Sequence, residues 1–150
     1  MANSLPRLYL DTSIPSAYYN DRQRERQMFT QHIWHEKLQN YHLVISNITA
    51  KELGATKNRK KKRKLVTLVR GIEVYVLTLA DKNLAQEYLK ILVMTKNDAL
   101  HAAGATVSGC EFLLSWNFTP LANYSSQQKI NGINLIHGYK AITIISPYQL

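Results

Sequence analysis

Five short runs of branched and aromatic residues alternate with longer helical stretches, and this alternation constrains the fold more than any other feature of the chain. Each run has five or six residues with turn or polar residues nearby; they are 7–11, 42–46, 73–77, 112–116 and 141–146. Strands that alternate with helices predict a parallel sheet covered by helices on both faces. We therefore expect an α/β fold in three layers.

Apolar residues at helical spacing predict the helices between these runs. The expected helices cover 22–38, 60–71, 81–93, 98–108 and 125–137. Asn97 is expected to cap the fourth of them, with Gly109 and Gly138 ending the last two. The sequence has no internal repeat and no linker rich in Pro, Gly or Ser, so we expect a single domain over residues 1–150.

The start of the chain and its cysteine content indicate a cytoplasmic protein. Residues 1–7 lack the apolar stretch of a secretory signal, and no segment reaches the roughly 18 apolar residues of a membrane span. Cys110 is the one cysteine, so no internal disulfide forms, and we expect it to be a small core residue.

The net charge of +9 is concentrated in one segment. Residues 51–70 hold nine Lys or Arg against the single acid Glu52. Such a concentration indicates a local anionic partner, and we predict that nucleic acid contacts the basic run Arg59, Lys60, Lys61, Lys62, Arg63 and Lys64. A solvated loop and a docking site for an acidic protein remain alternatives, whereas the helix is too short to favour a membrane surface.

Four polar residues lie at the ends of the expected elements. Asp11 closes the first strand and Glu52 follows the second; Asp98 begins the helix before the fourth strand, and Asn117 follows that strand. Each has a purely structural interpretation as well. Asp11 could cap a helix, and Glu52 could complete a capping box with Thr49. Asp98 could complement a helix dipole, and Asn117 could be a turn residue.

The same positions suit a metal site. Ligands of parallel α/β sheets bind outside the carboxyl ends of the strands. Carboxylate and amide oxygens there would bind a hard divalent cation, which lowers the pKa of a bound water and polarises a phosphoryl oxygen. Spacing alone leaves the structural and the metal-binding interpretations open.

Longer motifs resemble those of the PIN domain family, in particular the stand-alone bacterial members related to VapC-type toxins. The matching segments are 8–21, 43–53, 97–123 and 130–150. The third is the most specific, because it combines a DALH opening, a helix of small residues and a strand that ends in WNF.

The resemblance implies a five-stranded parallel sheet and an endoribonuclease that uses Mg²⁺ or Mn²⁺. A metal-activated water would hydrolyse RNA to leave a 5′-phosphate and a 3′-hydroxyl. Asp11, Glu52 and Asp98 match the family's metal ligands, and Asn117 takes a fourth catalytic position that is often Asp. Thr12 and Ser13 are expected to orient Asp11.

The resemblance leaves the cellular role open. It is compatible with the toxin of a toxin–antitoxin pair, with an antitoxin partner and a homodimer, and also with an RNA-processing enzyme. The neutral Asn117 makes a non-catalytic RNA-binding or protein-interaction module the alternative. We expect His101 to be a packed or solvent-edge residue, with a place facing the pocket as the alternative, because it lies one helical turn from Asp98. Tyr18, Tyr19 and Trp116 could either stack on bases or belong to the core.

Overall fold

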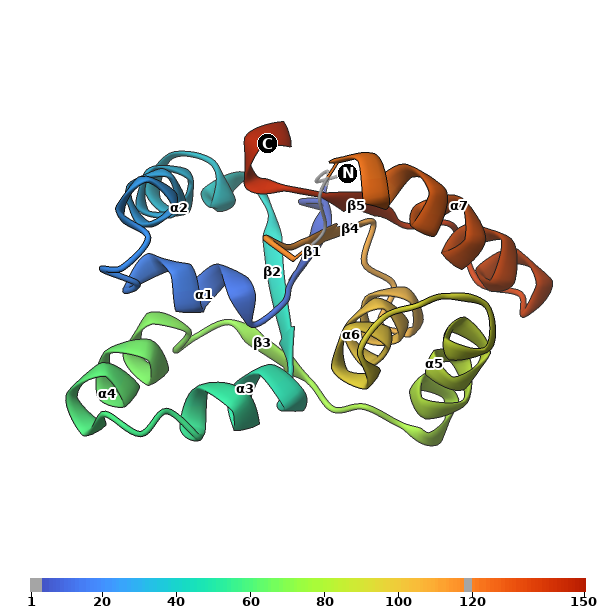
Figure 1. Ribbon diagram of the computed structural model, residues 1–150, viewed down its shortest axis with the longest axis horizontal. Coiled ribbons are helices and arrows are strands. Elements are labelled where there is room, and N and C mark those ends of the chain that lie inside the picture. The colour runs from blue at the N-terminus through green and yellow to red at the C-terminus, as the bar shows by residue number, and fades with distance from the viewer. Residues whose placement is uncertain (1–3, 118–119) are drawn as a thin grey trace.

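In the computed structural model, which describes residues 4–117 and 120–150, five parallel strands form one sheet (Figure 1). The strand order is β3-β2-β1-β4-β5, and every pair is parallel, which confirms the expected fold. The strands are β1 Arg7–Leu10, β2 His42–Ser46, β3 Glu73–Tyr75, β4 Phe112–Leu114 and β5 Thr143–Ile145. Four of them are shorter than the apolar runs, and at β3 and β5 the residues beyond the strand bond side chains instead of the ladder. Leu77, for example, donates its backbone N–H to Asn47 Oδ1.

Helices cover both faces of the sheet (Figure 1). The α-helices are α1 Ser13–Tyr18, α2 Arg24–Glu36, α3 Asn47–Gly54, α4 Arg59–Leu68, α5 Leu79–Ile91, α6 Lys96–Val107 and α7 Pro120–Ile136, with short 3-10 turns at Leu38–Asn40 and Pro147–Gln149. Helices α5, α6 and α7 lie on one side of the sheet, and α1, α2 and α4 lie on the other. In the described part of the chain, no helix combines the length and the apolar character needed to cross a bilayer.

The central strand β1 divides its side chains between two apolar cores. Tyr9 belongs to the core under α5, α6 and α7, whereas Leu8 and Leu10 belong to the core under α1 and α2. All three side chains are fully buried, as the two-residue period of a strand in a covered sheet requires. The strand thus delivers the next residue, Asp11, to the middle of the sheet's carboxyl edge.

Helix α7 begins at Pro120, five residues before the expected start, and two predicted helix caps are wrong. Thr95, not Asn97, caps α6, because the Thr95 hydroxyl accepts the backbone N–H of Asp98 at 3.0 Å. Helix α3 already begins at Asn47, so Thr49 lies buried inside it and cannot form the alternative capping box with Glu52. This leaves the Glu52 side chain available for contacts outside its own helix.

Two other local predictions are confirmed. Gly109 follows α6 with a φ of +78°, a left-handed conformation that glycine adopts without steric cost, and Cys110 beyond it is buried.

Candidate active site

Asp11 is a buried carboxylate at the carboxyl end of β1. Its side chain is 1% exposed, and its backbone N–H continues the ladder to Leu114 of β4 at 3.2 Å. Burial raises the pKa of the Asp11 carboxyl, while the nearby His101 and the hydrogen bonds from Ser115 and Ser13 lower it in part. A bound cation would therefore stabilise the ionised form of this carboxylate.

Two serines hold the Asp11 carboxylate from opposite sides. Ser13 donates both its backbone N–H, at 2.9 Å, and its hydroxyl to Oδ1, and the Ser115 hydroxyl donates to Oδ2. The backbone N–H of Trp116 donates to Ser13 Oγ and that of Asn117 to Ser115 Oγ, each at 2.9 Å. The segment after β4 therefore fixes the two hydroxyls that orient Asp11.

Glu52 approaches the same edge from α3. The hydroxyl of Thr12, the residue after Asp11, donates to Glu52 Oε1 at 3.0 Å. His101 Nε2 lies 3.1 Å from the same oxygen, and it carries the hydrogen because an ionised carboxylate can only accept. The hydrogen bond from His101 is the main cause that holds the pKa of Glu52 below its usual value. Both donors use Oε1, and among the described residues none reaches Oε2.

Tyr9 fixes the imidazole of His101. The Tyr9 hydroxyl lies 2.7 Å from His101 Nδ1 and 2.8 Å from the hydroxyl of Ser46, the last residue of β2. Burial raises the pKa of the Tyr9 phenol, so the hydroxyl keeps its proton for this network. The chain of contacts from Ser46 through Tyr9 and His101 to Glu52 sets the imidazole's orientation.

Asp98 and Asn117 are placed differently from these two acids. Asp98 lies in the first turn of α6, one turn before His101, and is partly exposed. Asn117 is exposed just beyond β4, where its backbone N–H contacts Ser115. Over residues 4–117 and 120–150, no group of three or more His, Cys, Asp or Glu lies close enough to hold a metal ion together. The structure links Asp11 and Glu52 through Thr12 without bringing Asp98 into one cluster with them.

A hard divalent cation still suits this donor set. Mg²⁺ keeps several waters and is often bound by only one or two carboxylates. Asp11 offers a buried oxygen donor with raised pKa, and Glu52 offers an oxygen, Oε2, that is left outside the hydrogen bonds from Thr12 and His101. Asp98, in the first turn of the same helix as His101, is a further carboxylate on this side of the sheet.

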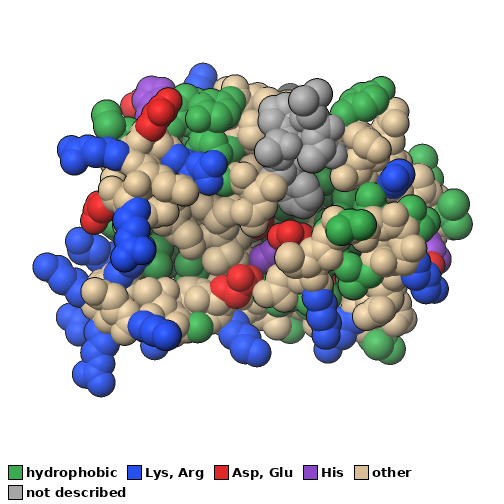
Figure 2. All heavy atoms as spheres, viewed as in Figure 1, with side chains coloured by type: hydrophobic (Ala, Val, Ile, Leu, Met, Phe, Trp, Pro, Cys, Tyr) green, Lys and Arg blue, Asp and Glu red, His purple; other side chains and the backbone are tan. Residues whose placement is uncertain are grey.

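The basic run forms the start of α4, as predicted, and its side chains lie largely in solvent. Lys and Arg side chains gather over α4 in the space-filling view, whereas acidic side chains and a histidine lie nearer the middle of the same face (Figure 2). Asn58 caps this helix by accepting the backbone N–H of Lys61 at 3.0 Å. A cationic region thus lies beside an acidic one, an arrangement that can offset the repulsion between carboxylates and a phosphate backbone.

The three aromatic residues have different environments. Trp116 is a core residue whose indole N–H donates to Thr30 at 3.0 Å, and Tyr18 bonds His35 at 2.8 Å. Tyr19 lies at the end of α1 and faces the basic helix.

Sequence reasoning did not identify Ser46, Ser115, Tyr9 or the contact of His101 with Glu52. The expectation that His101 is packed is correct, but its hydrogen bond to Glu52 also makes it part of the site. Ser46 ends β2 and Ser115 directly follows β4, so the strand-end rule that singles out Asp11 applies to both. Tyr9 lies inside an apolar run and gives no comparable signal.

Comparisons with known proteins agree with this fold. The family model described as "PIN domain" matches residues 8–117. Among solved structures, VapBC2 from Rickettsia felis, bound to a DNA fragment from its promoter, has a chain with a TM-score of 0.59 and 15% identity; the match covers 93% of this chain and 98% of that chain. Mycobacterium tuberculosis VapC20, a sarcin–ricin loop cleaving toxin, has a TM-score of 0.56 and 17% identity over 71% of this chain and 86% of that chain. A search of curated proteins found no match.

Proposed function

The chain belongs to the PIN domain family, and from this premise we propose that it is a ribonuclease that hydrolyses RNA phosphodiester bonds with the help of Mg²⁺ or Mn²⁺. The observation that carries the proposal is the link between Asp11 and Glu52, acids 41 positions apart that meet through Thr12 at the carboxyl edge of the sheet. A parallel sheet places its ligands at this edge.

The protein's own groups would position the reaction. Asp11 and Glu52 would hold the cation, with Asp98 as a further ligand directly or through water. When bound, the cation supplies an activated water and polarises the phosphoryl oxygen. Ser13 and Ser115 keep the Asp11 oxygens in place, and Thr12 and His101 turn Glu52 so that Oε2 faces away from their hydrogen bonds. The cationic face of α4 would bind the RNA backbone beside the acids.

We also propose a role as the toxin of a toxin–antitoxin pair, with an antitoxin protein as partner and a homodimer as assembly. The support is similarity in fold to a chain of the VapBC2 complex and to VapC20, which is a toxin that cleaves the sarcin–ricin loop. The test is co-purification of the full chain with the product of an adjacent gene, together with growth arrest on expression that the partner relieves.

Cleavage itself is tested with purified protein and a mixed RNA substrate. The proposal predicts products with 5′-phosphates in Mg²⁺ or Mn²⁺, and loss of these products in EDTA and in Asp11→Asn. Retained RNA binding in the same variant would show that the loss is chemical. Cleavage that persists in EDTA would contradict the proposal.

A second candidate is a non-catalytic RNA-binding module. It is favoured by the amide of Asn117 at the fourth position and by the lack of a three-residue metal cluster among the described residues. This candidate predicts salt-sensitive RNA binding with no product in any divalent cation.

A further inference from the structure

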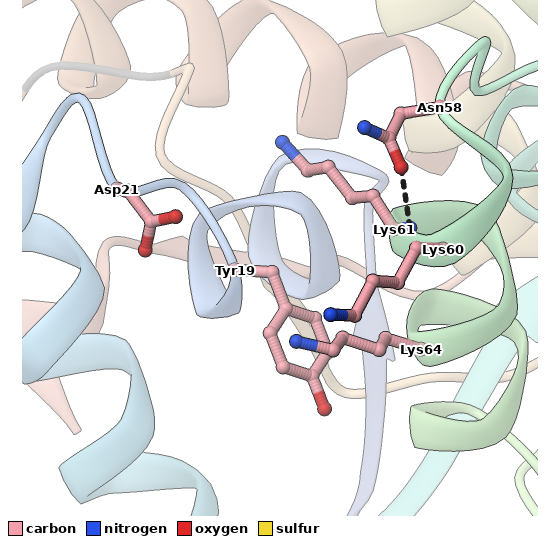
Figure 3. Close-up of a pocket in the computed structure, with 6 residues that line it drawn as sticks. All are labelled: Tyr19, Asp21, Asn58, Lys60, Lys61 and Lys64. Carbon is pink, nitrogen blue, oxygen red and sulfur yellow. Dashed lines mark hydrogen bonds between the residues drawn. The ribbon is translucent and has the colours of Figure 1, made fainter.

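Helix α4 separates the basic run into two faces. Residues three or four positions apart share a helix face, so Lys64 lies beside both Lys60 and Lys61, and the three lysines line one cavity of about 250 Å³. Tyr19, Asp21 and Asn58 complete its lining (Figure 3). The other three members of the run, Arg59, Lys62 and Arg63, line a separate surface hollow farther round the helix.

Three lysines form the α4 side of the cavity. The side chains of Lys60, Lys61 and Lys64 extend from α4 toward the segment that carries Tyr19 and Asp21 (Figure 3). Asn58 Oδ1 is engaged in capping the helix, and Asp21 Oδ1 accepts from Gln27 at 2.9 Å. Three ammonium groups against one carboxylate leave an excess of two positive charges, which favours an anion in the cavity.

Tyr19 gives the cavity an aromatic wall. Its ring is half-buried and is held edge to face by Tyr18, with ring centres 4.8 Å apart. Lys64 Nζ lies 5.6 Å from the centre of the Tyr19 ring. The Lys64 side chain is exposed, so a bound phosphate would draw its ammonium group off the ring and leave the ring face to a base.

We infer that this cavity binds one unpaired nucleotide of the RNA, with its phosphate on Lys60, Lys61 and Lys64 and its base on the ring of Tyr19. Asp21, on the opposite wall, repels a second anion, so the cavity suits one phosphate beside a neutral base better than an acidic peptide. A base inside a duplex has both faces stacked, so this site selects single-stranded or looped RNA. The inference rests on the proposed function, because it names the class of RNA that the same enzyme would cut.

The cavity lies a short helix away from the acids. Helix α1 leads from Asp11 and Thr12 to Tyr19, and its six residues span about 9 Å at ~1.5 Å per residue. Stacked nucleotides advance about 3.4 Å each along a strand, so this length corresponds to roughly three nucleotides. The bound base would therefore lie a few nucleotides from the bond that is cut.

Two variants of equal charge test the lysine face. The triple variants K60A/K61A/K64A and R59A/K62A/R63A each remove three positive charges from the same helix. Binding of a short fluorescein-labelled single-stranded RNA is measured by anisotropy in EDTA over a range of salt. The cavity variant is expected to bind more weakly than the matched control, with a salt slope smaller by about 0.7 for each phosphate that the lysines no longer neutralise. Equal weakening in both variants would overturn the inference.

Tyr19 variants test the stacking. Tyr19→Phe keeps the ring and is expected to bind like the natural chain, whereas Tyr19→Leu keeps apolar bulk and is expected to bind about 5- to 150-fold more weakly. The same RNA annealed to its complement should not distinguish the two variants. Equal affinity of the Phe and Leu variants for the single strand would refute the base contact, and tighter binding of an acidic peptide than of RNA at this cavity would overturn the inference in favour of a protein partner.

An error in the nucleotide-cavity inference and an error in the proposed nuclease function give different results. If the chain is not a nuclease, the Tyr19 and lysine effects on binding persist without any product. If the cavity does not bind a nucleotide, cleavage in Mg²⁺ or Mn²⁺ persists while Tyr19→Leu and the cavity triple variant bind RNA like their matched controls.

Discussion

Tyr9→Phe removes one hydroxyl from the centre of the site without opening a cavity. The hydroxyl bridges His101 Nδ1 and Ser46 Oγ, and the Tyr9 side chain is 0% exposed. Its removal leaves buried polar atoms unpaired, which costs about 1–3 kcal/mol of the free energy of unfolding. For a chain of this size each kcal/mol corresponds to roughly 2–4 °C in Tm.

The effect on cleavage should exceed the effect on folding. Without the Tyr9 hydroxyl, no hydrogen bond at Nδ1 orients the imidazole of His101, and Glu52 is left with a donor whose position is not fixed. Misplacement of a catalytic group by about 1 Å can cost ~100-fold, so we expect kcat/KM for RNA to fall roughly 10- to 100-fold at a temperature where the variant is folded.

Tyr88→Phe is the matched control. Tyr88 is also 0% exposed, and its hydroxyl contacts Asn134 and, at 3.3 Å, Thr106, neither of which belongs to the site. It should be destabilised by a similar amount, measured by thermal unfolding, and keep its cleavage rate. If Tyr9→Phe is destabilised like Tyr88→Phe but cleaves RNA like the natural chain, the network does not orient Glu52 and the reasoning is refuted.

Other variants test the energetics of the site and of the helices. In metal-free buffer, Asp11→Asn should raise Tm at pH 7. Burial raises the pKa of Asp11 in the folded state, so the ionised carboxylate destabilises the fold increasingly as pH rises above 3.8, the pKa of the unfolded chain. The increase in Tm should therefore shrink toward pH 4. An increase in Tm that does not depend on pH would contradict this. Gly132→Ala in α7 should stabilise by about 0.5–1 kcal/mol, because an added Cβ meets no atom within 4 Å. Gly104→Ala should be less stable than Gly132→Ala by about 1–3 kcal/mol, because its added Cβ would lie 2.9 Å from Leu77 Cδ2. Urea unfolding of the two variants measures this difference. Equal stabilities would show that Leu77 moves at no cost.

The sheet could be predicted from the sequence because its signal is local and repeated. Each apolar run indicates a strand, and the helices between the runs require parallel neighbours. The boundaries could not be placed as well, because they depend on which backbone groups find partners. Asn97 is of a residue type that often caps helices, but Thr95 is the residue whose hydroxyl accepts the backbone N–H of Asp98.

The sequence pointed to a candidate site residue only where a side chain that can bind a metal ion follows a strand. Asp11 meets both conditions. Glu52 lies near the end of a strand because its helix, α3, begins directly after β2. Contacts such as that of Tyr9 with His101 join residues 92 positions apart, and their geometry depends on how α6 packs on β1. Such a pairing exists only in the folded chain, so neither periodicity nor spacing could reveal it.

The central claim is that Asp11 and Glu52 hold a divalent cation for phosphodiester hydrolysis. An anomalous-scattering map of crystals soaked in Mn²⁺ tests it most directly. The account predicts a peak within bonding distance of both carboxylates, which is absent in Asp11→Asn. A peak bound elsewhere, or none at a Mn²⁺ concentration that supports RNA cleavage, would contradict it.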